Sequence, residues 1–212
     1  MLLIIAGIVF STMHQSSLGA VLLLMPEKLD GLWWTPALPV NIFLSAVAAG
    51  FAIMIVETVL SARVFRLPDE HVLLAGMGRL LAFALWIYLA FRVADMAYRG
   101  RLTSVLDSGK AALLLLEILP GVLIPACLLS SGRLRNHAGV LFAAALLVVL
   151  GIVFNRINVV WLALIVPGAA VYIPSLLEIL ITVSIIAALV FFFTLAVKTL
   201  PVFPSEAEQS FK

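Results

Sequence analysis

Six long apolar runs dominate the chain, and short polar stretches separate them. The runs cover residues 2–25, 37–60, 72–98, 109–130, 137–154 and 174–198. Each comes close to or exceeds the ~20 residues that an α-helix needs to cross about 30 Å of hydrocarbon. The strands of a membrane barrel are only about 10 residues long and alternate in polarity, which excludes a β-barrel. The pattern predicts an all-α, polytopic bundle of about six transmembrane helices.

Prolines lie at the ends of these runs and also inside one of them. Pro120 and Pro125 interrupt the run 109–130. They predict a kink or a discontinuity, because proline has no backbone N–H to donate. The stretch 155–172, between the last two runs, is too short and too broken by proline and glycine to be a seventh span. We expect a re-entrant or interfacial segment there.

The run 37–60 carries a stripe of small residues. Ser45, Ala49 and Ala52 follow one another at four- and three-residue spacing, with Ala46 and Gly50 beside them. Small side chains let membrane helices approach one another closely. We therefore expect this helix at the centre of the bundle.

The composition agrees with a membrane protein and excludes several functions. Of the 212 residues, 64% are hydrophobic and 11% are charged, about half the charged fraction of a soluble domain. A formal charge of +2 gives no sign of nucleic-acid binding. The single cysteine, Cys127, excludes an intrachain disulfide and an iron–sulfur cluster held by this chain's cysteines alone. We expect one transmembrane domain over residues 1–200 and a polar tail over 201–212.

Basic residues at the ends of the runs give a slight orientation signal. One side receives Arg63, Arg66, Arg133, Arg135, Lys198 and Lys212. The other side receives Lys28, Arg99, Arg101, Lys110 and Arg156. Because lysine and arginine concentrate in cytoplasmic loops, we expect the first side, with both termini, to be cytoplasmic.

Polar groups inside the apolar runs are the main functional signal, because a charged side chain at the centre of a membrane helix costs about 2.5–3.5 kcal/mol. His14, Gln15 and Ser16 lie within the first run. Arg92 and Asp95, three residues apart, share one face of the third predicted helix. The other ionisable residues in or beside the runs are Glu57, Arg79, Glu117, Arg156 and Glu178.

These groups suit a site for the headgroup of a quinone. Its two carbonyl oxygens need donors such as His, Gln or Arg, its isoprenoid tail can stay in lipid, and its redox reaction moves two protons. We expect His14, Gln15, Ser16, Arg92 and Asp95 to bind the headgroup. The remaining five ionisable groups are then candidates for a proton relay.

Structural explanations of the same charges stay open. Arg92 with Asp95, and Arg79 with Glu57, can be ion pairs that only neutralise each other within the membrane. A passive structural anchor or a small transporter of ions or solutes would also use buried charges of this kind.

A haem is the obvious rival cofactor. A membrane b-type haem needs two axial histidines at similar depth on facing helices. Only His14 is deep, whereas His71 and His137 lie at one edge of the predicted bundle. We expect no haem and no metal ion bound by this chain, and a haem at the edge, between His71 and His137, is the alternative that stays open.

Five stretches carry a resemblance to a known family, in the family's own order. They are STMHQSSLGAVLLLMPEKL, LWWTPALPVNIFLSAVAAGFAIMIVETVLSAR, FRVADMAYRG, NRINVVWLAL and YIPSLLEILITVSIIAALVFFFTLAVKTLPVFP. Together they resemble the membrane subunit, often called cytochrome b, of periplasmic nickel–iron hydrogenases. That subunit belongs to the polysulfide-reductase, or NrfD-type, family of membrane subunits. The likeness covers nearly the whole chain.

The resemblance implies a haem-free anchor that works beside a periplasmic ferredoxin-like iron–sulfur subunit and a hydrogenase-like catalytic subunit. It implies electron exchange with menaquinone or ubiquinone, and proton translocation has been proposed for this branch. It places the chain in the cytoplasmic membrane of a bacterium or archaeon, with both termini in the cytoplasm. His14 and Gln15 match the first two residues of the family's HQSSLG motif. Glu57 matches the acidic residue of the family's next helix, and Asp95 matches the acidic residue of its R-x-x-D segment.

The chain departs from the family in length. Hydrogenase-type members have further, earlier helices, and this chain matches only the later six spans. The resemblance therefore implies either a truncated or split gene product that a separate chain completes, or a fragment that does not turn over alone. We expect a subunit that is not catalytic alone, anchors the iron–sulfur subunit and exchanges electrons with quinone.

Overall fold

A computed structural model describes residues 2–24, 26, 29–65, 71–101, 111–159 and 174–199. They fall into two compact units, residues 1–167 and 168–212, and each is considered by itself. The long elements of the described residues are all helical, so the predicted all-α class is confirmed. The polar tail and most of the predicted re-entrant segment lie outside the described residues.

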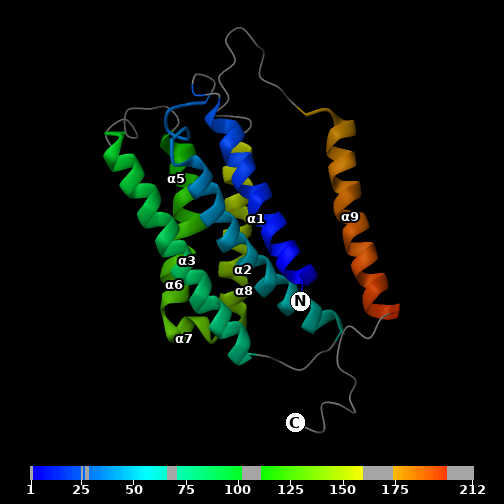
Figure 1. The fold of residues 1–212 in the computed structure, drawn as a ribbon. Helices are drawn as coiled ribbons and strands as arrows, with labels where there is room; N and C mark the ends of the chain where they lie inside the picture. The colour runs from blue at the N-terminus through cyan, green and yellow to red at the C-terminus, as the bar shows by residue number, and fades with distance from the viewer. Residues whose placement is uncertain are drawn as a thin grey trace. The chain divides into compact units, whose positions relative to one another are not determined.

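The helices follow the apolar runs closely (Figure 1). The first unit contains α1 (Leu2–Leu23), α2 (Leu38–Phe65), α3 (His71–Tyr98), α5 (Ala111–Ile118), the π-helical turn η1 (Leu119–Leu123), α6 (Ile124–Ser130), α7 (Gly132–Arg135) and α8 (Ala138–Ile157). The second unit contains α9 (Leu176–Thr199). Among the described residues, five stretches are long and apolar enough to cross a membrane, namely α2, α3 from Val72, the composite α5–η1–α6, α8 and α9. α1 has 22 residues and reaches about 33 Å at 1.5 Å per residue.

α2 lies at the centre of the first unit, as its small residues predict. It contacts α1, α3 and α8, and Figure 1 shows α1 running beside it. Ser45, Ala48 and Ala52 form its buried face, while Gly50 is exposed. The hydrophobic core joins this face to the other helices through Leu81 and Leu85 of α3, Ala126 and Leu129 of α6, and Ala144 and Val148 of α8.

The predicted discontinuity at the two prolines is confirmed. Pro120 lies in the π-helical turn η1, and Pro125 lies in the first turn of α6. Because Pro120 cannot donate a backbone hydrogen bond, the chain widens locally instead of continuing as a regular α-helix. A Cβ atom added at Gly121 would lie 2.7 Å from the Cα of Gly151. η1 and α8 therefore pack backbone against backbone.

α3 ends in a glycine cap. Gly100 has a φ of 63°, the left-handed conformation that costs glycine little. The Arg101 N–H donates to the carbonyl of Met96 over 3.0 Å, and the Gly100 N–H donates to that of Ala97 over 3.0 Å. These two bonds are the Schellman arrangement at a helix end. They leave Arg99 at the last turn, beside the segment 30–37.

Candidate functional site

The core-facing stripes of three helices become polar toward the same end of the first unit. On α3, for example, the stripe begins with the apolar Leu81 and Leu85. It continues, at spacings of three and four residues, to the polar Tyr88 and Arg92. The polar members are Asn41 and Ser45 of α2, Tyr88 and Arg92 of α3, and Asn155 and Arg156 of α8. The start of α2 and the ends of α3 and α8 lie at this end of the bundle (Figure 1).

A narrow cleft with a cavity volume of about 10 Å³, partly open to the outside, lies where these stripes meet. It is lined by Leu38, Asn41, Ile42, Tyr88, Arg92, Asn155, Arg156 and Val159. Apolar walls with a few convergent polar groups are typical of small-molecule sites.

Two polar side chains of the cleft are buried without partners. Arg92 is 2% exposed, and its Nε and Nη2 atoms have no hydrogen-bond partner among the described residues. Asn41 is 3% exposed, and both its amide atoms lack partners in the same part of the chain. A buried polar group left unpaired costs about 1–3 kcal/mol. A ligand that accepts hydrogen bonds from these groups would recover that cost.

The second arginine of the cleft is held in place by its neighbours. Arg156 donates through Nη2 to the hydroxyl of Ser45 over 2.9 Å and to the carbonyl of Ile42 over 3.4 Å. Its Nη1 donates to Oδ1 of Asn155 over 3.2 Å. The guanidinium is thus fixed against α2 at the wall of the cleft.

Glu117 of α5 lies behind this wall and is 2% exposed. Its Oε2 accepts hydrogen bonds from Trp33 Nε1 over 3.1 Å and from Asn158 Nδ2 over 3.2 Å. Its Oε1 accepts from Asn155 Nδ2 over 2.6 Å. Asn155 therefore links the Glu117 carboxylate to the guanidinium of Arg156.

Tyr88 lies near the charged groups of Arg92, Glu117 and Arg156. It is buried, and its hydroxyl lies within electrostatic range of Arg92, Glu117 and Arg156. The end of the bundle thus holds two guanidinium groups and one carboxylate around a single aromatic hydroxyl.

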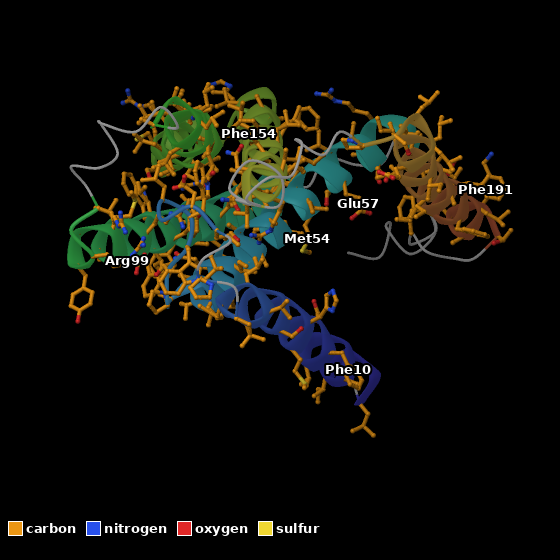
Figure 2. All side chains as sticks on the ribbon, turned by 90° about the horizontal axis from the view of Figure 1, so that it is seen from above. Phe10, Met54, Glu57, Arg99, Phe154 and Phe191 are labelled. Atoms are coloured by element: carbon orange, nitrogen blue, oxygen red, sulfur yellow. The ribbon has the colours of Figure 1, made fainter. Side chains whose placement is uncertain are left out.

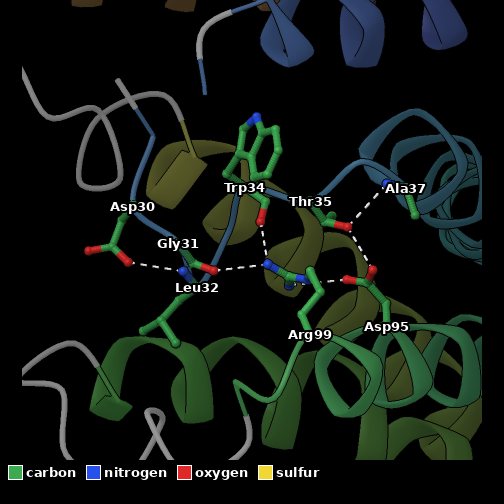
Figure 3. Close-up of polar contacts among 8 residues, drawn as sticks. All are labelled: Asp30, Gly31, Leu32, Trp34, Thr35, Ala37, Asp95 and Arg99. Carbon is green, nitrogen blue, oxygen red and sulfur yellow. Dashed lines mark hydrogen bonds and ion pairs between the residues drawn. The ribbon is translucent and has the colours of Figure 1, made fainter. Parts of the chain in front are cut away.

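A second polar cluster lies nearby and contains an ion pair (Figure 3). Asp95 and Arg99 form an ion pair of 3.1 Å between Oδ2 and Nη2. Thr35 donates its hydroxyl to Asp95 Oδ1 over 2.7 Å, and Arg99 Nη1 donates to the carbonyls of Gly31 over 3.1 Å and Trp34 over 2.6 Å. The cluster fastens the segment 30–37 to the end of α3.

The ion pairs considered from the sequence are not formed. Asp95 pairs with Arg99, four residues later, and not with Arg92, which follows the core stripe into the cleft. Glu57 and Arg79 are both exposed, and no ion pair joins these two described residues. Figure 2 shows Glu57 on the outer side of α2, away from Phe154 of α8.

Among the predicted headgroup residues whose side chains are described, only Arg92 lines the cleft. His14 is exposed on α1, and its backbone carbonyl accepts a hydrogen bond from Ser17 Oγ over 2.9 Å. The side chains of Gln15 and Ser16 lie outside the described ones. Of the haem candidates, His137 is exposed, and the side chain of His71 is not described.

Two of the five predicted relay residues come together. Glu117 and Arg156 meet through Asn155, whereas Glu57 and Arg79 lie on exposed faces of α2 and α3. Glu178 lies in the first turn of α9, in the second unit, where its N–H donates to Ser175 Oγ over 3.4 Å.

Sequence reasoning missed the neutral members of the cleft. Asn41, Tyr88 and Asn155 carry no charge, so they did not stand out among apolar neighbours. The available signal was their helical register: Asn41 precedes Ser45 by four residues, and Asn155 follows Val148 by seven. Each of the three therefore continues a core-facing stripe.

No family model and no solved structure matches the chain. Curated proteins do. A protein of Nitratidesulfovibrio vulgaris (strain Hildenborough) is 35% identical over 211 residues, which cover 95% of this chain and 54% of the relative. The probable Ni/Fe-hydrogenase 2 b-type cytochrome subunit of Escherichia coli K12 is 30% identical over 206 residues, 95% of this chain and 52% of the relative.

The integral membrane subunit of menaquinone reductase from N. vulgaris is 31% identical over 229 residues, 95% of this chain and 54% of the relative. The chain thus spans about half the length of the curated relatives it matches. The likeness indicated by its motifs is confirmed: over 95% of its length the chain is similar to a probable hydrogenase b-type cytochrome subunit and to the integral membrane subunit of menaquinone reductase.

Proposed function

We propose that this multi-pass membrane protein is the quinone-reactive subunit of a respiratory oxidoreductase complex, and that the quinone headgroup binds in the cleft beside Arg92. One relative is named an integral membrane subunit of menaquinone reductase, and another a hydrogenase b-type cytochrome subunit. Both names describe subunits of redox complexes in bacterial membranes. Menaquinone is accordingly the first candidate, with ubiquinone the second.

The unpaired donors of the cleft carry the proposal. A quinone ring presents two carbonyl oxygens that accept hydrogen bonds, and Arg92 offers two buried N–H groups to such an acceptor. The amide of Asn41 is equally unpaired and lines the same cleft. Tyr88, Ile42 and Val159 supply apolar contact for the ring. The donors therefore suit the carbonyl oxygens of a quinone headgroup.

The chain contributes binding and orientation, and its partner contributes the electrons. Reduction of a quinone takes up two electrons and two protons, which convert both carbonyls into hydroxyls. We assign the electrons to the iron–sulfur centre of a partner subunit. Donors already fixed toward the ring oxygens stabilise the negative charge that reduction places on them.

Asp95 acts in this proposal as a positioning residue. Its pair with Arg99 fixes the segment 30–37, and Trp33 of that segment donates to Glu117. Glu117 in turn holds Asn155. A proton relay through Glu117 and Arg156, with Glu57, Arg79 and Glu178, stays a prediction, as does a headgroup role for His14, Gln15 and Ser16.

The test uses the intact complex, isolated from its native membranes through an affinity tag on this chain. The iron–sulfur centre is reduced with dithionite, excess reductant is removed, and electron transfer to 2,3-dimethyl-1,4-naphthoquinone is followed optically. We expect Arg92→Gln to slow this transfer at least about tenfold, the effect of losing one charged hydrogen bond. The matched control is Arg79→Gln, an exposed arginine on the same helix, which should keep the wild-type rate.

The same preparation separates the rival functions. If Arg92→Gln keeps the wild-type rate in a complex of unchanged composition, the quinone site is not in this cleft. If no variant changes quinone reduction, the chain is a passive anchor. If no iron–sulfur subunit copurifies and the chain alone conducts ions in liposomes, it is a transporter.

A further inference from the structure

The positive charges that line the cleft are not neutralised by direct contact with carboxylates. Nearby, Arg99 forms an ion pair with the carboxylate of Asp95. Arg92 and Arg156 have no carboxylate within ion-pair distance among the described residues. Glu117 shares their neighbourhood, but its two oxygens accept from three neutral N–H groups. The cleft is therefore lined by two guanidinium groups and by no acidic side chain.

An uncompensated guanidinium is costly in this position. Arg92 is 2% exposed and lies on a helix long and apolar enough to span a membrane. Charged groups inside membrane helices normally pair with an opposite charge or face a polar cavity. Arginine also binds carboxylate and phosphate oxygens through short, charge-assisted hydrogen bonds, which are roughly twice as strong as bonds between neutral groups. An anion in the cleft would supply the missing counter-charge.

We propose that the cleft binds an oxyanion carried by an amphiphile and prefers it to a neutral headgroup of the same shape. Resting on the proposed quinone function, the ligand class is a quinone whose ring oxygen carries negative charge, as it does on reduction, and an ionised hydroxyquinone is a stable probe of that class. Arg92 binds this oxygen through Nε and Nη2, and Arg156 of α8 adds positive charge in the same cleft. The phosphate of an anionic phospholipid has the same chemistry and is the second source of such an oxygen.

The preference is measured with the full chain in phosphatidylcholine nanodiscs at pH 7.5. The probes are a 2-hydroxy-3-alkyl-1,4-naphthoquinone, ionised at this pH, and its 2-methoxy analogue, which is neutral and has the same ring and tail. Titration calorimetry gives both dissociation constants, and empty nanodiscs correct for partition into lipid. We expect the hydroxy compound to bind about tenfold or more tightly than the methoxy compound.

Variants assign the preference to the cleft. Arg92→Gln should remove it, Arg92→Lys should keep it because the charge remains, and Arg79→Gln should leave both constants unchanged. Circular dichroism confirms that each variant is folded. Arg156→Gln, in the same cleft, should weaken the hydroxy compound more than the methoxy compound.

The outcomes separate this inference from the proposed function. Equal affinity for both probes, lost together in Arg92→Gln, overturns the oxyanion preference and leaves a neutral quinone site in place. Absence of any binding that depends on Arg92 overturns both. If phosphatidylglycerol nanodiscs weaken the hydroxy compound about tenfold only when Arg92 is present, a lipid phosphate is the oxyanion that occupies the cleft.

Discussion

Two arginines seven residues apart lie in the last two turns of α3 and just beyond its end, and the two have different surroundings. Arg99 contacts a carboxylate and two backbone carbonyls, and these contacts fasten a loop segment to the helix. Arg92, on the core-facing stripe, is more deeply buried and has no carboxylate within ion-pair distance among the described residues. The charge of Arg99 is thus compensated by direct contact, whereas that of Arg92 is not.

The difference shows that burial alone does not separate a structural arginine from a functional one. Removing one partner of a buried ion pair is strongly destabilising, because it leaves the other charge uncompensated. An arginine that is already unpaired stabilises nothing by its charge, and an apolar replacement removes a cost. Stability and binding should therefore respond in opposite ways at Arg99 and Arg92.

The largest effect is expected from Arg99→Leu. The change leaves the Asp95 carboxylate and the carbonyls of Gly31 and Trp34 without their donor. We expect the free energy of unfolding to fall by about 3–5 kcal/mol, measured by SDS-induced unfolding in mixed micelles. The double variant Asp95→Leu with Arg99→Leu should recover part of this loss. Full wild-type stability in Arg99→Leu would show that the cluster is not structural.

A smaller loss of stability is expected from Gly151→Ala, a variant that tests the packing of η1 against α8. A methyl group there collides with the backbone at Gly121, so η1 and α8 must separate. We expect a loss of about 2 kcal/mol in the same unfolding assay, with weaker probe binding. Gly139→Ala on α8 is the matched control, because nothing lies within 4 Å of its added methyl. Equal stability of the two variants would contradict the close approach.

Arg92→Leu should change stability by no more than about 1 kcal/mol, and in the stabilising direction. No ion pair is broken, and an apolar side chain replaces an unpaired charge. The unfolding assay used for Arg99→Leu measures this difference directly. A loss as large as that of Arg99→Leu would mean that Arg92 has a structural partner and that the contrast between the two arginines does not hold.

The smallest effect is expected from His14→Ala. The side chain is exposed on α1 and does not line the cleft, and substitutions at exposed positions usually change free energies by about 0.5 kcal/mol or less. Quinone reduction should therefore stay within about twofold of the wild-type rate. A fall equal to that of Arg92→Gln would place the headgroup at His14, as the HQSSLG motif predicts.

Much of the fold follows from local sequence. The apolar runs predict the helices, since a spanning segment must satisfy its own backbone hydrogen bonds and have a fixed minimum length. Pro120 and Pro125 predict the break between α5 and α6, and small residues predict the central place of α2. Each of these depends on neighbours within a few residues in the chain.

The pairing of charged residues at the candidate site could not be predicted from local sequence. Asp95 has Arg92 three residues before it and Arg99 four residues after it, and helical spacing allows either pair. Thr35 and the carbonyls of the segment 30–37 decide in favour of Arg99, and that segment lies some 60 residues earlier in the chain.

By itself, the sequence determined the membrane class, the helices and the likeness to membrane subunits of redox complexes, because these rest on composition, periodicity and motif. Only the tertiary structure decided that Arg92 has no carboxylate partner among the described residues and that Asn41, Tyr88 and Arg156 share its cleft. The physical reason is that a hydrogen bond or an ion pair depends on distances between helices. Residue spacing along one helix does not specify those distances.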